Sequence, residues 1–231
     1  NQLPENPFTF IPAQQLRADF NSISRQAVGL PPSLHHELAA QYVQNPQRVE
    51  WQQLSVQGIA DVVAFIEQDD IENTFIQQFK NFAPEVQLAF CNSFENRGIS
   101  PPCTAMLLNW WRAAPHTPER LIALLRALSQ SNEHLVLSDV INQVLEHNEW
   151  LSQDVMIILA ARHWQSLHDI KLMSVFMHKL AEMNTNLFGG LFRDLVQIPD
   201  TRTKMLNILR MPDKSPHLAL AIEQLFANET I

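Results

Sequence analysis

Glycine and cysteine are scarce in this sequence, and their scarcity removes several classes of functional site. The 231 residues contain 5 glycines and 2 cysteines. A loop that cradles phosphate groups needs clustered glycines, and only Gly189-Gly190 places two together, where close helix packing explains them equally well. Cys91 and Cys103 do not form a CxxC pair, so we expect neither a disulfide framework nor a structural zinc site. A reducing, cytoplasmic setting fits this composition.

A net positive charge and long apolar runs are also absent from the sequence. The formal net charge is -8, whereas nucleic acids and anionic membranes attract proteins with a cationic face. The longest apolar run, VMIILAA at 155–161, is far shorter than the roughly 20 residues that span a bilayer. We therefore expect no nucleic-acid partner and no membrane partner.

Complete catalytic signatures are absent as well. The sequence has no HExxH, no Glu-x-x-His pair of a di-iron bundle, no GxSxG and no dinucleotide-binding fingerprint. We therefore predict a protein that is not an enzyme, with no catalytic residues, no bound metal and no cofactor.

Proline is abundant, and its placement predicts an all-α fold. Most of the 14 prolines stand at the edges of Leu-rich stretches with helical spacing. Proline suits the first turn of a helix, where its missing N–H would have no partner. The 3.6-residue period between these starts predicts helices over 33–44, 47–67, 70–81, 84–96, 101–113, 118–130, 133–147, 153–166, 169–183, 187–197, 201–210 and 216–228.

The predicted helix starts near 84, 118, 152 and 186 repeat at an interval of about 34 residues, which is typical of stacked helix pairs. This period favours a HEAT-like helical-repeat array, an α-solenoid, and an irregular helical bundle is the alternative. The array is predicted to be one domain over 33–231. Residues 1–32, which include the extended stretch NPFTFIP, are predicted to form an arm or linker.

Trp110 and Trp111 are the residues that raise the question of a binding site. On a helical wheel Trp110 falls near the centre of an apolar arc, Trp111 lies at its edge and Arg112 points roughly the opposite way. Tryptophan at the edge of an apolar face is common in recognition surfaces. Trp111 and Arg112 are therefore the predicted partner-binding residues, with a half-buried packing role for Trp111 as the alternative.

Two acidic stretches raise a second hypothesis. DDIEN and SDVINQVLE resemble, imperfectly, the two magnesium motifs of class I terpene synthases. Carboxylates spaced three and four apart on a helix can hold magnesium against a diphosphate. Acids at a helix start also suit the helix dipole, which explains the first stretch without a metal. The residues concerned are Asp69, Asp70, Asn73, Asp139, Asn142 and Glu146.

Three longer stretches resemble an uncharacterised family of gammaproteobacterial proteins that is known as a domain of unknown function. They are NPFTFIPAQQLRADFN (6–21), WQQLSVQGIADVVAFIEQ (51–68) and VQIPDTRTKMLNILR (196–210). The resemblance covers most of the chain and implies a bacterial cytoplasmic protein, but it carries over no catalytic or binding residues. Members of the family are longer at the N-terminus, so this chain, which starts at Asn1, is expected to be their C-terminal part.

The function that these observations favour is that of a non-enzymatic helical-repeat scaffold or adaptor, which binds a protein or peptide along a concave face. Two alternatives stay open. One is a magnesium-dependent, diphosphate-binding helical enzyme, and the other is structural or dimerisation support for a missing N-terminal domain.

Overall fold

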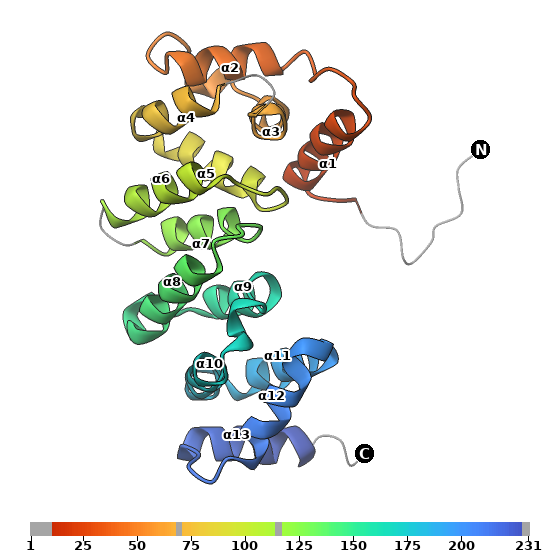
Figure 1. Cartoon of the computed structure of the whole chain (residues 1–231), viewed down its shortest axis with the longest axis vertical. Helices are drawn as coiled ribbons and strands as arrows, with labels where there is room; N and C mark the ends of the chain where they lie inside the picture. The colour runs from red at the N-terminus through yellow and green to blue at the C-terminus, as the bar shows by residue number, and fades with distance from the viewer. Residues whose placement is uncertain (1–10, 68–70, 114–116, 228–231) are drawn as a thin grey trace, which may run out of the picture. The chain divides into compact units, whose positions relative to one another are not determined.

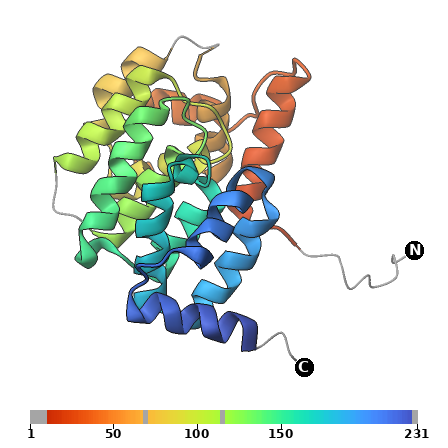
Figure 2. The same ribbon diagram turned by 60° about the horizontal axis from the view of Figure 1, so that its bottom comes forward.

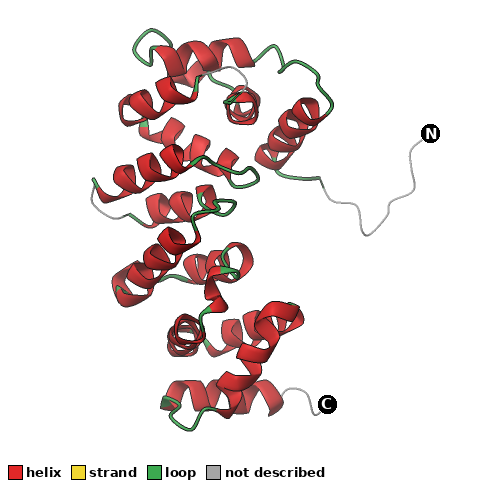
Figure 3. Cartoon of the chain, viewed as in Figure 1, coloured by secondary structure: helices red, strands yellow, loops and turns green. Residues whose placement is uncertain are grey.

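The computed structural model describes residues 11–67, 71–113 and 117–227, and the regular structure in these ranges is entirely helical (Figures 1 and 3). The all-α prediction is therefore confirmed. The chain divides into two compact units, Asn1–Met106 and Leu107–Ile231, and the point of division falls inside a helix. We call them unit 1 and unit 2.

In unit 1 several helices pack on the next helix but one, and α2 also packs on its neighbour α3. Helix α1 packs on α3, α3 packs on α5, and α2 packs on α4. Figure 1 shows α1 beside α3, and Figure 2 shows α1 along its length. The elements are α1 (Gln14–Ala27), α2 (His36–Gln44), η1 (Trp51–Gln53), α3 (Val56–Phe65), α4 (Glu72–Gln78), η2 (Phe79–Asn81), α5 (Pro84–Phe94) and the first half of α6 (Pro101–Arg112).

A cluster of phenylalanines forms the interior of unit 1. Phe75 is at its centre, with its ring centroid 5.0 Å from that of Phe90 and 5.4 to 5.7 Å from those of Phe79, Phe82 and Phe94. Most of these pairs are edge-to-face, the arrangement that aromatic quadrupoles prefer. The cluster joins α4, η2 and α5, so these three short elements share one apolar core.

Gly58 fixes how closely α3 approaches the start of α2. A Cβ atom added at Gly58 would lie 2.5 Å from the carbonyl oxygen of His35. That oxygen belongs to the backbone, so it cannot move aside as a flexible side chain would. Glycine is therefore required at this position for close packing, although its backbone is helical.

Unit 2 combines packing on the next helix but one with packing between neighbours, since α11 packs on both α10 and α12. Helix α9 packs on α7 and on α11, while α10 packs on α8 and on α12. The elements are the end of α6, α7 (Pro118–Ala127), α8 (His134–Glu146), η3 (Asn148–Trp150), α9 (Gln153–Arg162), η4 (Ser166–His168), α10 (Ile170–Met183), α11 (Thr185–Gln197), α12 (Pro199–Arg210) and α13 (Pro216–Ala227).

Four of the predicted proline starts are confirmed, whereas no helix begins at Pro46. Helices α5, α6, α7 and α13 begin at Pro84, Pro101, Pro118 and Pro216. At Pro118 the hydroxyl of the preceding residue, Thr117, accepts a hydrogen bond from the backbone N–H of Arg120. The four starts that define the predicted 34-residue interval are observed at residues 84, 118, 153 and 185.

Two predicted ranges are wrong. The arm or linker predicted over 1–32 contains helix α1, so residues 14–27 are not extended. The single helix predicted over 47–67 is divided, because Leu54 and Ser55 are extended and the Ser55 hydroxyl caps a new helix by accepting from Gly58 N–H. The prediction that 33–231 forms a single domain stays a prediction.

Candidate functional site

Helix α1 contacts the rest of unit 1 through polar side chains. Its fully buried partner is Asp61 of α3, whose Oδ1 accepts from the Ser22 hydroxyl at 2.6 Å and from Gln57 Nε2 at 3.0 Å. Oδ2 of the same carboxyl group accepts from the backbone N–H and from the hydroxyl of Ser33. One carboxyl group therefore ties α1, α3 and the segment before α2 together.

A second buried acid, Asp19, lies on α1 itself. Its Oδ1 accepts from the Ser93 hydroxyl and from Gln15 Nε2, both at 2.9 Å. Its Oδ2 is buried and has no hydrogen-bond donor within the described part of the chain. Burial raises the pKa of Asp19 from 3.8 to about 6, although hydrogen bonds from Ser93 and Gln15 act in the opposite direction. We call the contacts of Asp19 and Asp61 the polar seam.

Another side of α1 is apolar, and three of its four residues are exposed while Ile23 is half-buried. Leu16, Phe20, Ile23 and Ala27 recur at intervals of four, three and four residues, so they fall within a single arc of about 60°. Leu16 is 47% exposed and Phe20 is 73% exposed. We call these four residues the outer face of α1. Helix α1 thus differs from an ordinary amphipathic helix, because its buried residues include Asp19 and Ser22 while Leu16 and Phe20 are exposed.

Exposed apolar side chains continue beyond the end of α1. Gly29, with φ of 72°, ends the helix, and Leu30 N–H donates to the carbonyl of Arg25, as in a Schellman motif. Val28 and Leu30 beside this turn are 70% and 50% exposed. Large apolar areas on a protein surface mark interaction sites more often than catalytic sites.

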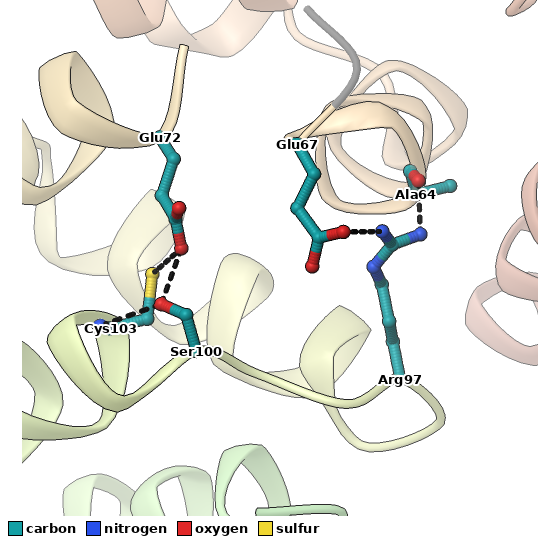
Figure 4. Close-up of polar contacts among 6 residues, drawn as sticks. All are labelled: Ala64, Glu67, Glu72, Arg97, Ser100 and Cys103. Atoms are coloured by element: carbon teal, nitrogen blue, oxygen red, sulfur yellow. Dashed lines mark hydrogen bonds and ion pairs between the residues drawn. The ribbon is translucent and has the colours of Figure 1, made fainter. Parts of the chain in front are cut away.

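A second polar cluster in unit 1 contains Cys103 (Figure 4). Glu72 Oε1 accepts from the Ser100 hydroxyl and from the Cys103 thiol, whose sulfur is 3.4 Å away. The Ser100 Oγ also accepts from the backbone N–H of Cys103 in the first turn of α6. Burial, reinforced by the charge of Glu72, raises the pKa of Cys103 to about 12. The thiol therefore stays protonated near neutral pH and does not supply a thiolate nucleophile or metal ligand.

Arg97, also drawn in Figure 4, caps the C-terminal end of α3. Its Nη1 donates to the carbonyl of Ala64, and its Nη2 lies 3.9 Å from Oε2 of Glu67. Burial lowers the pKa of Arg97, while the charges of Glu67 and Glu72 oppose that change. A cation at the C-terminal end of a helix stabilises the last carbonyl groups. We therefore interpret the residues in Figure 4 as structural contacts.

The predicted position of Trp111 at the edge of an apolar arc is wrong. Trp111 is 1% exposed, and its ring meets that of Trp150 edge-to-face, with the centroids 5.5 Å apart. The helical wheel includes neighbours on α6 alone, whereas Trp150 comes from η3, much later in the chain. A side chain buried to this degree has no surface to offer a partner.

Arg112 and Trp110 have different surroundings. Arg112 is exposed at the end of α6, and its partner-binding role stays a prediction. Trp110 is buried as predicted, at 8% exposure, and the guanidinium of Arg120 lies over its ring at 3.9 Å. The Arg120 Nη2 also donates to the Trp110 carbonyl, so the arginine fixes the start of α7 against the end of α6.

The magnesium hypothesis receives no test from the structure. Asp69 and Asp70 lie outside the described residues. Asp139 and Glu146 are exposed on α8. Within the described ranges, no group of three His, Cys, Asp or Glu side chains is placed to hold a metal ion.

None of the helices in the described ranges combines the length and the apolar character that crossing a membrane requires.

Sequence reasoning missed the outer face of α1, although its signal is present. The spacing of Leu16, Phe20, Ile23 and Ala27 is helical. The prolines on either side, at 4, 7, 12, 31 and 32, instead favour an extended arm. The burial of Asp19 could not be found this way, because its partner Ser93 is distant in sequence.

Comparison with known proteins identifies the family. Residues 1–226 match the family described as "Protein of unknown function (DUF3549)", and the chain belongs to that family. This confirms the resemblance to a domain of unknown function. No curated protein and no solved structure matches the chain.

Proposed function

We propose that this chain is a non-catalytic, HEAT-like helical-repeat module that binds an apolar, acidic segment of another protein through the outer face of α1. The observation that carries the proposal is the exposure of Leu16 and Phe20 on a helix whose inward side is polar. A surface helix ordinarily buries its apolar side against its own domain. Here that side is turned toward solvent, where a partner can bury it.

The repeat architecture is supported by the alternating packing within each unit. In unit 1, α3 packs between α1 and α5. In unit 2, α9 packs on α7 and on α11 in the same way. Stacked helix pairs bury their apolar faces against their neighbours in this way. Such arrays serve as binding surfaces, which agrees with an adaptor or scaffold role.

The charge of α1 selects the chemistry of the partner. The charged residues of the helix are Arg17, Asp19 and Arg25, and Asp19 is buried. Arg17 is exposed and borders the outer face, so the accessible charge next to the apolar residues is positive. A symmetric pair of copies would bring two faces of the same positive charge together. An acidic partner segment instead complements this charge.

Site-specific photo-crosslinking in the host cell tests the proposal. The full-length protein carries p-benzoylphenylalanine in place of Phe20, and the control carries it in place of Phe226 of α13, which is 52% exposed. We expect a protein crosslinked at position 20 and not at position 226, joined through a segment rich in apolar and acidic residues.

The crosslinked protein is then purified and its affinity for variants is measured. We expect Leu16→Ser/Phe20→Ser to weaken binding at least tenfold, and the matched variant Leu220→Ser/Phe226→Ser to leave it unchanged. Binding that survives Leu16→Ser/Phe20→Ser would overturn the proposal. A crosslink between two copies of this chain would contradict the acidic partner.

A further inference from the structure

Helix α1 shares little of the apolar interior of unit 1. Its buried residues are Ala18, Asp19 and Ser22, none of which has a large apolar side chain. The phenylalanine cluster that forms the interior of unit 1 comes from α4, η2 and α5, so no residue of α1 belongs to it. A segment with little buried apolar area opens at a lower cost in free energy than a core does.

A hinge and an anchor follow directly after α1. Gly29, with φ of 72°, and its neighbours Val28 and Leu30 are exposed. Glycine adopts many backbone conformations at little steric cost, so the chain can change direction at this point. Ser33, a few residues later, is held in place, because its backbone N–H and its hydroxyl both donate to Oδ2 of Asp61 on α3. A movement of α1 about Gly29 therefore leaves the start of α2 where it is.

The contact of α1 with α3 can be lost without leaving Asp61 unpaired. The Ser22 hydroxyl of α1 donates to Oδ1 of Asp61 at 2.6 Å. Oδ1 also accepts from Gln57 of α3, and Oδ2 accepts from Ser33 of the anchored segment. Both oxygens of Asp61 therefore keep a donor after α1 has moved away.

The contact of α1 with α5 depends on a carboxyl group that has one paired and one unpaired oxygen. Oδ1 of Asp19 accepts from Ser93 and Gln15, whereas Oδ2 is buried and makes no hydrogen bond within the described residues. Burial raises the pKa of Asp19 to about 6; the polar groups of Ser93, Gln15 and Asn96 oppose this change, and the charge of Glu95 adds to it. The docked position of α1 therefore favours the protonated, neutral form of Asp19.

The charged groups around Asp19 act in the same direction. Helix α3 carries Asp61, and α5 carries Glu85 near its start and is followed by Glu95. Neither helix has a basic residue, so ionised Asp19 meets charges of its own sign on both helices. The two cations of α1 itself are Arg17 and Arg25. Neither arginine is buried, so solvent screens their charges.

We propose that α1 is a hinged helix with a proton-dependent latch: a proton on Asp19 keeps it docked on α3 and α5, and loss of that proton makes α1 open more often while the rest of unit 1 stays folded. The latch is independent of the proposed function, because it involves contacts inside unit 1 alone and its test needs no partner. Its consequence for recognition rests on the proposed function: a partner of the outer face meets a docked helix at acidic pH and a more often released helix near neutral pH.

Hydrogen exchange of the full chain at low concentrations of denaturant tests whether α1 opens alone. We expect the amides of α1 to exchange through an opening that is at least about a hundredfold more frequent than the one that exposes α3. The frequency of this opening should depend weakly on denaturant, because release of α1 exposes little surface. Exchange of α1 and α3 with equal frequency and equal dependence on denaturant would overturn the proposal.

The pH dependence of the same opening tests whether Asp19 is the latch. After correction for the intrinsic exchange rate, the opening of α1 should become about tenfold more frequent between pH 5 and pH 7.5, which follows from a pKa of about 6 in the docked helix and 3.8 in the released one. Asp19→Asn removes the titrating group and should remove this rise. Glu85→Gln, which removes an exposed acid of α5, is the matched control and should retain it.

A second variant keeps Asp19 and moves its titration. Ser93→Ala removes a hydroxyl that donates to Asp19 and lowers its pKa, so we expect the rise in opening to level off at a higher pH than in the unmodified chain. An equal rise in Asp19→Asn and in the unmodified chain would refute the latch, as would a Ser93→Ala curve that does not shift.

Discussion

Helix α1 of unit 1 and helix α9 of unit 2 are held in place by opposite kinds of contact. The buried residues of α1 are Ala18, Asp19 and Ser22. Those of α9 are Val155, Met156, Ile158, Leu159 and Ala160. Apolar burial contributes roughly 1.5 to 3 kcal/mol for each large side chain, whereas a buried hydrogen bond contributes a net of about 1 kcal/mol.

This difference shows where each unit is sensitive. A polar seam is directional, so the loss of one acceptor leaves several donors without partners. An apolar interior is sensitive to lost volume, and to charge only where a titratable group is buried in it. Unit 2 has one such group in His163, which is 2% exposed at the end of α9 and lies 2.7 Å from the Leu125 carbonyl through Nε2.

The largest effect is expected in the interior of unit 2. Trp111→Ala removes a fully buried indole that packs on Trp150. Deletions of this size cost about 3 to 5 kcal/mol, so the free energy of unfolding should fall by that amount. Chemical denaturation followed by far-ultraviolet circular dichroism measures the change. A cost below about 1 kcal/mol would contradict the buried position of Trp111.

The second effect concerns the polar seam. Asp61→Ala removes the acceptor shared by Ser22, Ser33 and Gln57, and we expect a loss of about 3 kcal/mol from unit 1. Hydrogen exchange should increase first in α1, because α1 is joined to α3 by this carboxyl group. Ser24→Ala on the same helix is the control and should change little. Equal exchange in α1 of Asp61→Ala and the unmodified chain would show that the seam does not hold the helix.

The third effect is a dependence on pH. The pKa of Asp19 is raised to about 6 in the folded chain, so between about pH 4 and pH 6 the folded state binds a proton that the unfolded state has lost. Its contribution to stability is therefore present at low pH and is lost as the pH rises through 6, with a full difference of about 3 kcal/mol. Asp19→Asn should abolish this dependence on pH. Hydrogen exchange of α1 at pH 5 and at pH 7.5, in the variant and in the unmodified chain, measures it.

His163 provides the contrast in unit 2. Burial lowers its pKa from 6.5, although the Leu125 carbonyl acts in the opposite direction. Its contribution to stability is thus present above pH 6.5 and is lost as the pH falls below that value. His163→Gln retains a donor for the carbonyl and should remove the acid sensitivity of α7 and α9. If both units responded to pH in the same direction, the assignment of these two groups would be wrong.

The sequence predicts well where helices begin. It predicts poorly which side chains become buried against distant parts of the chain. Pro84, Pro101 and Pro118 mark helix starts through local chemistry, and the observed helices begin at those residues. Trp111 and Asp19 are misjudged or missed because their burial depends on Trp150 and Ser93, which no local pattern connects to them. A pocket lined by Trp164, Asp169 and Asp200 is assembled from a turn and the starts of separate helices, and no spacing within one helix indicates it.

The smallest effect on stability is expected at the outer face of α1. Phe20→Ser removes a large apolar side chain that is 73% exposed, so the free energy of unfolding should change by less than about 0.5 kcal/mol. The substitution also tests directly whether this side of α1 is exposed. If α1 buried its apolar side, Phe20→Ser would lower the free energy of unfolding several times more. Thermal denaturation of Phe20→Ser and of Trp111→Ala under the same conditions compares the two losses of stability. A large loss for Phe20→Ser would mean that this side of α1 is already covered in the folded chain, and the proposed docking surface would lose its basis.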